Sequence, residues 1–394
     1  MTASNNNLKV NSSLKKTDSL MTITAVDFDF MAHAFRLAER GLYTTMPNPR
    51  VGCVLVKDGK IVGEGWHVRA GEGHAEVNAL HSAGENVRGA TAYVSLEPCS
   101  HTGKTGPCSQ ALIDAGIARL VYAMEDPNPL VSGNGIAMIR AAGIQVDGPV
   151  LEDDARALNP GFIRRMERKL PYVRCKMAMS IDGRTAMASG ESKWITGPKA
   201  RADVQRLRAR SCAIISGVDS ILQDNASLTV RVDELGLPNA EDAAATQPLR
   251  VILDSQLRTP RTALMFKQAT PILLVHNGKV EDAQLKDWPD FVEIIALPGK
   301  DGRIDLNALL RELANRHCNE VLVEAGATLS GSFLRRGLLD EIIMYMAPKL
   351  LGSNALPLFN LPLDTMSAAL SLKIKDIRAV GRDWRITSVP DTEY

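Results

Sequence analysis

The chain has 394 residues, 45% of them hydrophobic, which is enough for two or three domains with substantial cores. Its 46 basic and 45 acidic residues give a net charge of +1, so composition gives no sign of a nucleic-acid partner or an anionic membrane. No apolar run approaches the ~18 residues of a membrane-spanning helix. Six cysteines in so long a chain do not indicate a disulfide framework; Cys53, Cys175, Cys212 and Cys318 are predicted to be buried thiols, which indicates a reducing, cytoplasmic location.

The N-terminal part of the chain changes character at about residue 25. Residues 1–24 are rich in Asn, Ser, Lys and Thr and lack the apolar core of a signal peptide, so we predict a disordered tail. An amphipathic helix is predicted over 28–40. A strand over 51–56, a turn at 57–60 and a return strand from Ile61 then predict a β-hairpin.

A set of candidate metal ligands follows the hairpin. His74 and Glu76 form an H-x-E motif, Cys99 follows a proline, and Cys108 follows after eight intervening residues. One imidazole and two thiolates suit Zn²⁺, and three protein ligands leave a fourth position for water, whose pKa zinc lowers towards ~7 to give hydroxide. Glu76 is placed to move protons rather than to bind metal. H-x-E followed by P-C-x-x-C is a zinc-deaminase signature, which this chain keeps except for the wider cysteine gap.

The predicted local structure places these ligands at the ends of secondary-structure elements. A helix follows His74, a strand over 92–96 runs into Cys99, and Cys108 opens a second helix. A helix N-terminus favours the thiolate and lowers a cysteine pKa. Three further elements complete a compact α/β domain: a strand at 118–124, a helix at 136–142 and a strand at 144–146.

A basic, helical connector over 151–170 separates this domain from a second one. We place the domains at 25–168 and 169–394. The second domain alternates strands with helices, the helices being predicted across 198–210 and 305–316. Its strands are predicted at 172–179, 212–216, 250–254, 271–276, 320–324 and 341–347.

The segment after the strand at 320–324 consists of small residues. Residues 326–331 predict a turn into a helix that starts near Ser332, and backbone N–H groups at such a helix start can hold a phosphate. The segment is neither G-x-G-x-x-G nor a P-loop, and any tight strand-to-helix crossover has a similar sequence. Nucleotide binding and a plain crossover therefore both remain open from this segment alone.

The chain resembles the bifunctional deaminase/reductases of riboflavin biosynthesis over about residues 25 to 390. In the first half, the resemblance rests on the motifs Asn48–Gly52, His74–Glu76 and Glu97–Cys108. In the second half, it rests on Ser180–Thr185, Ser192–Thr196, Asp224-Asn225, Leu228–Arg231 and Glu324–Gly326. The wide cysteine gap is itself usual in this family. The resemblance implies a cytidine-deaminase-like three-layer domain followed by a dihydrofolate-reductase-like α/β domain.

The resemblance also implies two activities in one multifunctional, dimeric enzyme. The first domain would be a zinc-dependent hydrolase that deaminates 2,5-diamino-6-(5-phosphoribosylamino)pyrimidin-4(3H)-one, a small phosphorylated pyrimidine. The second would be an NADPH-dependent oxidoreductase that reduces the ribosyl group of the resulting aminouracil to ribityl. Zinc binding is carried onto His74, Cys99 and Cys108, and proton transfer onto Glu76.

The remaining implied site residues fall into three groups. Deaminase substrate contacts are implied at Asn48, His67, His101, Lys104, Asp126 and Asn128. Reductase substrate contacts are implied at Ser192, Arg208, Leu228, Arg231 and Glu324. Coenzyme contacts are implied at Ala178, Trp194, Ser220, Asp224, Ser255, Gly326, Ala327, Thr328, Leu329, Ser330, Gly331 and Ser332. Taken alone, His67 would be interpreted as an ordinary hydrogen-bonded surface histidine, and each arginine as half of a surface ion pair.

Two other functions share some of these features. A nucleic-acid-editing deaminase would use the same zinc site but needs a basic or aromatic surface to hold a polynucleotide, and the balanced charge and 5% aromatic content disfavour it. The second half would then be a non-catalytic module for ligand binding or oligomerisation. That alternative predicts no coenzyme oxidation with any substrate.

Overall fold

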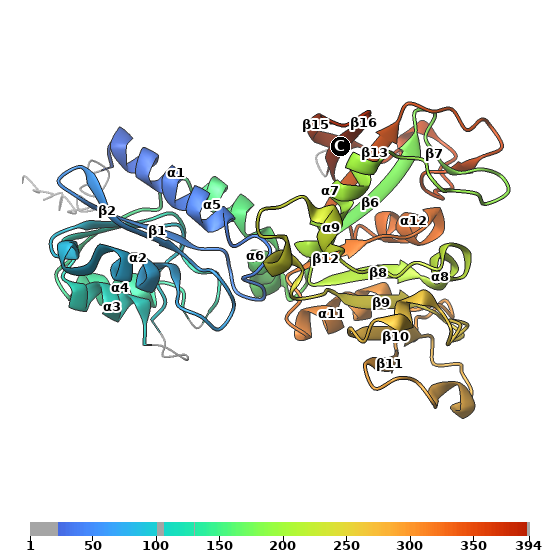
Figure 1. Ribbon diagram of the computed structural model, residues 1–394, viewed down its shortest axis with the longest axis horizontal. Helices are drawn as coiled ribbons and strands as arrows, with labels where there is room; N and C mark the ends of the chain where they lie inside the picture. Colours follow the sequence, from blue (N-terminus) through green and yellow to red (C-terminus); the bar gives the residue numbers. More distant parts are fainter. Residues whose placement is uncertain (1–22, 101–105, 130, 392–394) are drawn as a thin grey trace, which may run out of the picture.

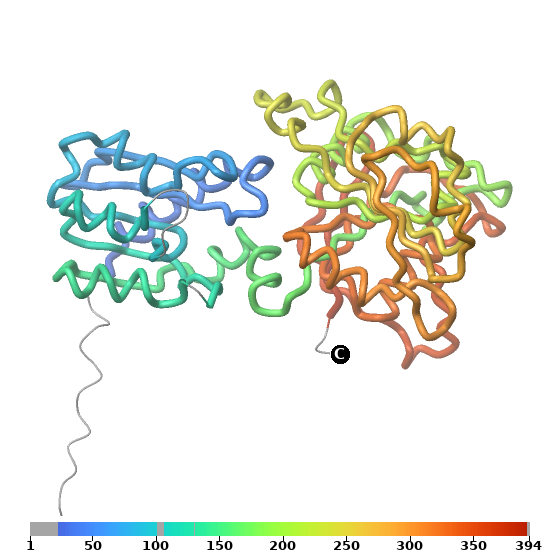
Figure 2. Tube along the Cα trace, turned by 90° about the horizontal axis from the view of Figure 1, so that it is seen from below, coloured from blue at the N-terminus to red at the C-terminus, as the bar shows by residue number. Residues whose placement is uncertain are grey.

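The computed structural model describes residues 23–100, 106–129 and 131–391 of the chain. These residues form an N-terminal and a C-terminal α/β lobe, which lie side by side with the helical connector between them (Figures 1 and 2). No helix in the described ranges is both long and apolar enough to span a membrane. The predicted tail falls outside these ranges up to residue 22, as do the implied substrate residues His101 and Lys104.

The N-terminal lobe is built on a five-stranded sheet with the order β2-β1-β3-β4-β5. The strands are β1 (Gly52–Lys57), β2 (Lys60–Trp66), β3 (Thr91–Val94), β4 (Arg119–Tyr122) and β5 (Gln145–Asp147). β1 pairs antiparallel with β2 and β3, whereas β3, β4 and β5 are parallel. The predicted hairpin is confirmed, and its turn places both Asp58 and Gly59 at positive φ, as a type I′ turn requires.

Helices cover both faces of this sheet and complete three layers. Alternate residues of β1 point to opposite faces: Val54 and Val56 pack under α1 (Ala25–Glu39), whereas Cys53 and Leu55 pack against the helices of the other face. The helices on that other face are α2 (Ala75–Ala83), α3 (Cys108–Ala115) and α4 (Asn134–Ala141), with a 3₁₀ turn at Gly84–Val87. The lobe therefore has the three-layer architecture that the resemblance implied.

The connector consists of two short helices, α5 (Glu152–Leu158) and α6 (Pro160–Arg168). Phe162 and Ile163 of α6 belong to the core of the N-terminal lobe, under α1. The opposite side of α6 meets the C-terminal lobe at Gly161, where a Cβ atom would lie 2.5 Å from the Asn319 carbonyl oxygen. A glycine is required here because the two backbones approach so closely.

The C-terminal lobe is built on a nine-stranded sheet with the order β11-β10-β9-β8-β12-β6-β13-β16-β15. The strands are β6 (Tyr172–Ser180), β8 (Ala213–Gly217), β9 (Leu249–Leu253), β10 (Ile272–His276), β11 (Val292–Ala296), β12 (Glu320–Val323), β13 (Glu341–Ala347), β15 (Leu372–Val380) and β16 (Asp383–Pro390). A two-stranded ribbon joins β7 (Arg184–Ala186) to β14 (Leu356–Pro357). Seven neighbouring strands are parallel, and β16 and β15 extend the sheet antiparallel.

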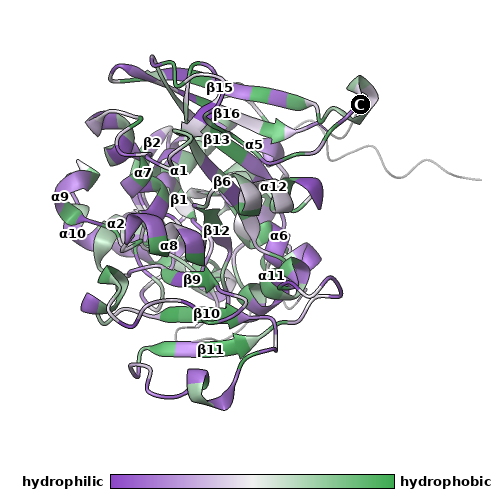
Figure 3. Cartoon of the chain, turned by 90° about the vertical axis from the view of Figure 1, so that its right-hand side faces the viewer, coloured by the Kyte–Doolittle hydropathy of each residue, from purple (hydrophilic) through white to green (hydrophobic). Residues whose placement is uncertain are grey.

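All six strands predicted in this half are confirmed, because each is a short apolar run that is buried in the sheet; β9 and β10 stand out in the hydropathy colouring of Figure 3. The leucines of α11 cover one face of the sheet, and α7 covers the other. The helices of this lobe are α7 (Pro198–Ala209), α8 (Val218–Asp224), α9 (Val232–Leu235), α10 (Ala240–Ala244), α11 (Leu306–Asn315) and α12 (Ala327–Arg335), with 3₁₀ helices at Leu264–Lys267, Asp282–Leu285 and Met366–Ala368.

The start of α12 differs from the sequence-based prediction. The helix begins at Ala327, capped by Gly326, so the predicted start near Ser332 is wrong by about a turn. Serine and glycine in the predicted turn indicated a loop, but Gly331 lies inside the helix. Its missing side chain makes room for the backbone of Asn360, whose oxygen would lie 2.6 Å from a Cβ atom.

Candidate functional site

The three candidate metal ligands converge at one end of the N-terminal sheet. His74 is the N-cap of α2, Cys108 is the first residue of α3, and Cys99 lies on the loop after β3. The His74 Nδ1 atom lies 3.6 Å from the Cys99 Sγ atom and 3.3 Å from the Cys108 Sγ atom, and the three ligand atoms lie within 4.8 Å of one another. Zn–S and Zn–N bond lengths in a tetrahedral site give ligand separations of about 3.5 Å. The group therefore has the chemistry and the size of a three-ligand zinc site.

Without a metal ion, the two cysteines share one proton: the thiolate of Cys99 is favoured, whereas the hydrogen bond with Cys99 raises the pKa of the Cys108 thiol. The Cys99 sulfur accepts a hydrogen bond from the Cys108 backbone N–H, at 3.4 Å. Hydrogen bonds from the Cys108 side chain and from the His74 ring lower the pKa of the Cys99 thiol to about 4. Zinc binds thiolates, so a cysteine held in this form is ready to coordinate.

Glu76 lies beside the ligands but does not belong to the set. It is the second residue of α2, it is 3% exposed, and its burial raises the pKa of the carboxyl group to about 7. A carboxyl group with a pKa near neutrality both accepts and releases protons at working pH, which is the property of a general acid/base.

Two of the implied deaminase contacts form a pair against the metal cluster. His67 is buried, and its Nδ1 atom lies 3.1 Å from the Gly73 carbonyl oxygen, so this nitrogen donates. Its Nε2 atom then accepts from the Asn48 amide, at 3.1 Å, and the His67 ring stands edge-on to His74 at 5.3 Å. Burial also lowers the pKa of His67, which keeps the ring neutral. The surface interpretation of His67 is therefore wrong.

In the C-terminal lobe, a second cluster lies just beyond the end of β12. Arg208 forms a bidentate ion pair with Glu324, with distances of 2.6 and 3.0 Å, and Lys176 of β6 approaches the same carboxylate at 3.5 Å. Burial would raise the pKa of Glu324, but Arg208 and Lys176 lower it to about 2. The carboxylate is therefore ionised, and it presents a fixed hydrogen-bond acceptor.

A cavity of about 820 Å³ opens next to this cluster, at the carboxyl ends of β8, β9 and β12. Ligand sites in open α/β sheets lie at this edge. The first turn of α12 lines the cavity, and the N–H groups of a first turn have no partner within their own helix. Seven implied coenzyme residues line it: Ser220, Ser255, Gly326, Ala327, Thr328, Leu329 and Ser332.

Comparisons with known proteins match both lobes. The cytidine and deoxycytidylate deaminase zinc-binding region matches residues 25–124, and the RibD C-terminal domain matches residues 171–386. The riboflavin biosynthesis protein RibD of Escherichia coli is 49% identical over 358 residues, which cover 90% of this chain and 96% of that protein. This chain belongs to the RibD family. It is a bifunctional deaminase/reductase of riboflavin biosynthesis, with a zinc-binding deaminase site and a reductase domain that uses NADPH.

Solved RibD structures share the whole arrangement of the two lobes. RibD of Acinetobacter baumannii superposes with a TM-score of 0.85 at 45% identity, over 93% of this chain and 99% of that one. A protein of Thermotoga maritima superposes with a TM-score of 0.82 at 34% identity, over 93% of this chain and 99% of that one. It is described as a diaminohydroxyphosphoribosylaminopyrimidine deaminase and 5-amino-6-(5-phosphoribosylamino)uracil reductase. The RibD family assignment replaces the alternative of an editing deaminase with a non-catalytic module.

Other implied residues of this RibD family member lie apart from the cavity or the clusters. Trp194 is 64% exposed and stacks under the Arg201 guanidinium at 4.5 Å. Arg231 forms an exposed bidentate pair with Glu234, and Leu228 is buried. The implied coenzyme residues that do not line the cavity are Ala178, Trp194, Asp224, Ser330 and Gly331. Ser192 donates a hydrogen bond to Asp224, at 3.4 Å.

Sequence reasoning missed residues that shape both sites. The buried Glu97 carboxylate accepts four backbone N–H bonds, from Asp126, Gly133, Gly135 and Ile136, and so fixes the loop that carries the implied contacts Asp126 and Asn128. In the sequence, Glu97 stands directly before Pro98 and the zinc ligand Cys99, and this position could have indicated that Glu97 shapes the site. Lys176 in the reductase cluster was also missed, although its alternation with Arg174 along β6 marks both as facing the same side.

Proposed function

We propose that the N-terminal lobe deaminates 2,5-diamino-6-(5-phosphoribosylamino)pyrimidin-4(3H)-one and that the C-terminal lobe reduces the ribosyl group of the product with NADPH. The observation that carries the proposal is the buried Glu76 carboxyl group beside the His74, Cys99 and Cys108 ligand set. The same two activities are named for the related protein of Thermotoga maritima. We place the boundary between the two catalytic domains at residues 168 and 169.

In the deaminase site, the residues of the chain have distinct roles. His74, Cys99 and Cys108 would hold the zinc ion, which would supply Lewis-acid activation of water. The Glu76 carboxylate takes the proton from the attacking water and delivers it to the ring nitrogen and then to the departing ammonia. A single buried carboxyl group serves these transfers in turn, because a carboxylate that has taken a proton from water can release it to the substrate; burial favours the protonated form by raising the pKa.

The polar groups around Glu76 orient the pyrimidine. Asn48 is hydrogen-bonded to the neutral His67, so the remaining donor and acceptor of the Asn48 amide are held in fixed directions. Both ring nitrogens of His67 are already used, one on the Gly73 carbonyl oxygen and one on Asn48, so the proposed substrate contact of His67 is made by the ring itself. Asp126 and Asn128 contribute from the loop that Glu97 fixes, and His101 and Lys104 complete the set of proposed substrate contacts. A lysine suits the phosphate of this substrate.

In the reductase site, the ionised Glu324 orients the sugar hydroxyl groups, while Ser192, Arg208, Leu228 and Arg231 complete the substrate contacts. NADPH would supply the hydride, and the protein would orient the coenzyme and the substrate and provide the electrostatic environment. The N-terminus of α12, which lines the cavity, would hold the phosphates of the coenzyme. Proposed coenzyme contacts that line the cavity are Ser220, Ser255, Gly326, Ala327, Thr328, Leu329 and Ser332; those outside it are Ala178, Trp194, Asp224, Ser330 and Gly331.

The chain also forms a homodimer in this proposal. The antiparallel extension of the large sheet exposes apolar side chains at its edge, on β15 and β16. The register pairs Ile374 with Ser388, Ile377 with Ile386 and Ala379 with Trp384, so Ile374, Ile377 and Trp384 share one face. These three side chains are 46–58% exposed, and Figure 3 shows the alternation of apolar and polar residues along β15. A second copy would cover this face and remove the exposed apolar surface from water.

A cytoplasmic location is the remaining part of the proposal. All six cysteines are free thiols, and three of them, Cys53, Cys175 and Cys318, are buried without a metal role. A reducing compartment keeps such thiols unpaired.

The proposal is tested by incubation of the purified protein with the diaminopyrimidinone, with and without NADPH, followed by mass spectrometry. Without NADPH, the deaminated aminouracil with its ribosyl group intact is expected to accumulate. With NADPH, the ribityl product is expected. No deaminated product in either reaction would refute the deaminase assignment, and accumulation of the ribosyl compound in the presence of NADPH would refute the reductase assignment.

A further inference from the structure

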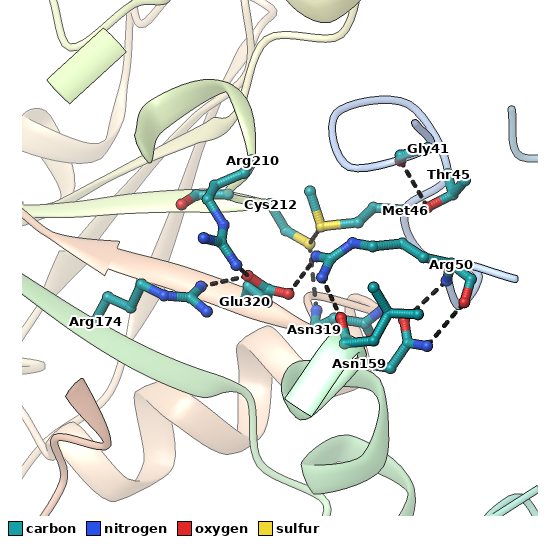
Figure 4. A network of polar contacts seen from close by, with 12 residues as sticks. Gly41, Thr45, Met46, Arg50, Asn159, Arg174, Arg210, Cys212, Asn319 and Glu320 are labelled. Carbon is teal, nitrogen blue, oxygen red and sulfur yellow. Dashed lines mark hydrogen bonds and ion pairs between the residues drawn. The ribbon is translucent and has the colours of Figure 1, made fainter. Parts of the chain in front are cut away.

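Two adjacent residues of the C-terminal lobe bind a loop of the deaminase site. Asn319 lies just before β12, and its side-chain amide donates to the carbonyl oxygen of Pro47 at 2.8 Å. Glu320, the first residue of β12, forms an ion pair with the guanidinium group of Arg50 (Figure 4). Pro47 and Arg50 belong to the segment between α1 and β1. One corner of the reductase lobe therefore holds this segment at two points.

Asn48 and Pro49 lie between those two points, and Asn48 is a proposed substrate contact of the deaminase. Its backbone N–H donates to the Thr45 carbonyl oxygen at 2.9 Å, and its side-chain amide donates to His67 at 3.1 Å. The segment is held again at Met46, whose sulfur lies 3.2 Å from the Cys212 sulfur of the reductase lobe (Figure 4). Residues on both sides of Asn48 therefore depend on the other lobe for their position.

The ion pair between the lobes is almost completely removed from water. The side chain of Arg50 is 5% exposed and that of Glu320 is 2% exposed. Glu320 also binds Arg174 and, at 3.4 Å, Arg210, so one carboxylate serves three guanidinium groups. Arg174 has a second carboxylate partner in Glu341, at 2.7 Å, which does not contact the deaminase loop. A buried charge that loses its partner is strongly destabilised, so Arg50 is held firmly at this position.

The connector strengthens the same contact from a third side. Asn159, between α5 and α6, accepts from the Arg50 N–H and donates to the Arg50 carbonyl oxygen, both at 2.8 Å. The Arg50 guanidinium also donates to the Leu158 carbonyl oxygen at 2.5 Å. The backbone of Arg50 and its charged end are thus both fixed, which leaves the two residues before it little freedom.

We propose that Glu320 and Asn319 of the reductase lobe are positioning residues for deamination: they hold Arg50 and Pro47, and thereby aim Asn48 at the pyrimidine. This inference rests on the proposed function, in particular on a substrate contact by Asn48. The deaminase site is then complete only when the reductase lobe is docked against it. The physical link runs through main-chain and ion-pair contacts and requires no substrate transfer between the sites.

The first test is Glu320→Gln in the full chain, assayed for both activities. A misplaced Asn48 loses a hydrogen bond to substrate, so the deaminase KM is expected to rise about two- to tenfold. The deaminase kcat and the zinc content stay near wild type, because Glu76 and the metal ligands lie on other elements. The reductase KM for the deaminated compound also stays near wild type, since Glu324 keeps Arg208 and Lys176. An unchanged deaminase KM, or an equal rise in both KM values, would overturn the proposal.

Glu341→Gln is the matched control. It removes a carboxylate from the same arginine cluster, next to Arg174, but not from Arg50. The deaminase KM of this variant is expected to equal that of the wild type. If Glu341→Gln raises it as much as Glu320→Gln does, the effect is general destabilisation of the cluster and the proposal fails.

A double-mutant cycle tests whether the effect passes through Asn48. In an Asn48→Ala background, Glu320→Gln is expected to change the deaminase KM no further, because the side chain it positions is gone. The double variant is compared with the single variant Asn48→Ala. If Glu320→Gln raises the deaminase KM by the same factor with and without Asn48, the effect does not pass through Asn48 and the proposal fails.

Asn319→Ala provides the test if Glu320→Gln fails to fold, because it removes the hold on Pro47 while Glu320 keeps its three arginine partners. It also removes the Asn319 oxygen that accepts from the half-buried Arg165 at 2.5 Å. A raised deaminase KM with unchanged reductase KM supports the proposal, and an unchanged deaminase KM refutes it. Failure of the proposed function gives a different result. In that case the wild-type protein itself would not deaminate the pyrimidinone, so no KM could be compared.

Discussion

Replacement of Glu76 by glutamine separates the two activities of the chain. Glutamine has nearly the same shape as glutamate, so it fills the buried position, of which only 3% is exposed, without creating a cavity. It cannot accept and release a proton at neutral pH. The ligand atoms of His74, Cys99 and Cys108 are unchanged, so the zinc content is expected to stay near that of the wild type.

The size of the effect follows from the number of proton transfers that depend on this group. Loss of one general acid/base costs about 10²–10⁴-fold in rate, or roughly 3–5 kcal/mol of barrier at about 1.4 kcal/mol per decade. In the proposed mechanism, Glu76 serves several transfers, and burial sets its pKa to about 7. We therefore expect Glu76→Gln to lower the deaminase kcat by about 10⁴-fold.

The assay follows both reactions in the same preparation. With the diaminopyrimidinone, NADPH oxidation by the variant is expected to stall because no intermediate forms. With the already deaminated compound, NADPH oxidation is expected at close to the wild-type rate, because the reductase cluster and cavity lie beyond residue 170. Normal deamination by Glu76→Gln would refute the role of the carboxylate. Loss of reduction of the deaminated compound would refute the separation of the two sites.

Four further outcomes are expected. Wild-type protein carries about one zinc per chain by elemental analysis, and Cys108→Ser loses most of it. Gly326→Val raises the KM for NADPH roughly five- to a hundredfold without affecting deamination, because its Cβ atom meets no protein atom within 4 Å but enters the coenzyme space. Ile377→Lys converts the proposed homodimer into a monomer in sedimentation analysis, because it would bury a charge in the apolar face. The low pKa of Glu324 contributes about 3 kcal/mol of folding stability above pH 4.5, which is lost as pH falls towards about 2; urea unfolding of Glu324→Gln lacks this part of the pH dependence.

Each of these predictions has an outcome that contradicts it. Equal zinc contents in the wild type and in Cys108→Ser would show that the Cys108 sulfur is not a zinc ligand. An unchanged KM for NADPH in Gly326→Val would place the coenzyme phosphates away from the start of α12. A dimer that survives Ile377→Lys would place the interface on another surface, and an unchanged acid profile in Glu324→Gln would show that its carboxylate is not specially stabilised in the fold.

The zinc site was predictable because its determinants are local. His74, Cys99 and Cys108 lie within 35 residues, and each is next to a predicted helix or strand end, so ligand chemistry and spacing were sufficient. The inner strands of the large sheet were predictable for a similar reason: they are buried on both faces and form continuous apolar runs. In both cases, the local sequence pattern matches the environment that the residues have in the folded protein.

The edge strands were missed because their sequence does not carry that signal. Along β15, lysines alternate with apolar residues, and the strand is exposed over almost its whole length. β11, at the other edge of the sheet, is only half-buried. These segments become strands because they pair with a neighbour that is already in the sheet, and such pairing depends on residues distant in the sequence.

The sequence by itself determined the ligand set of the deaminase, the order of most strands and helices, and the resemblance that implied two activities. Only the tertiary structure decided which distant groups meet. Arg50 and Glu320 are 270 residues apart, and Arg208 and Glu324 are 116 residues apart, yet each pair shares a buried contact. Taken singly in the sequence, these arginines are indistinguishable from surface cations. Their partners and burial are set by how strands and lobes pack, which no local pattern specifies.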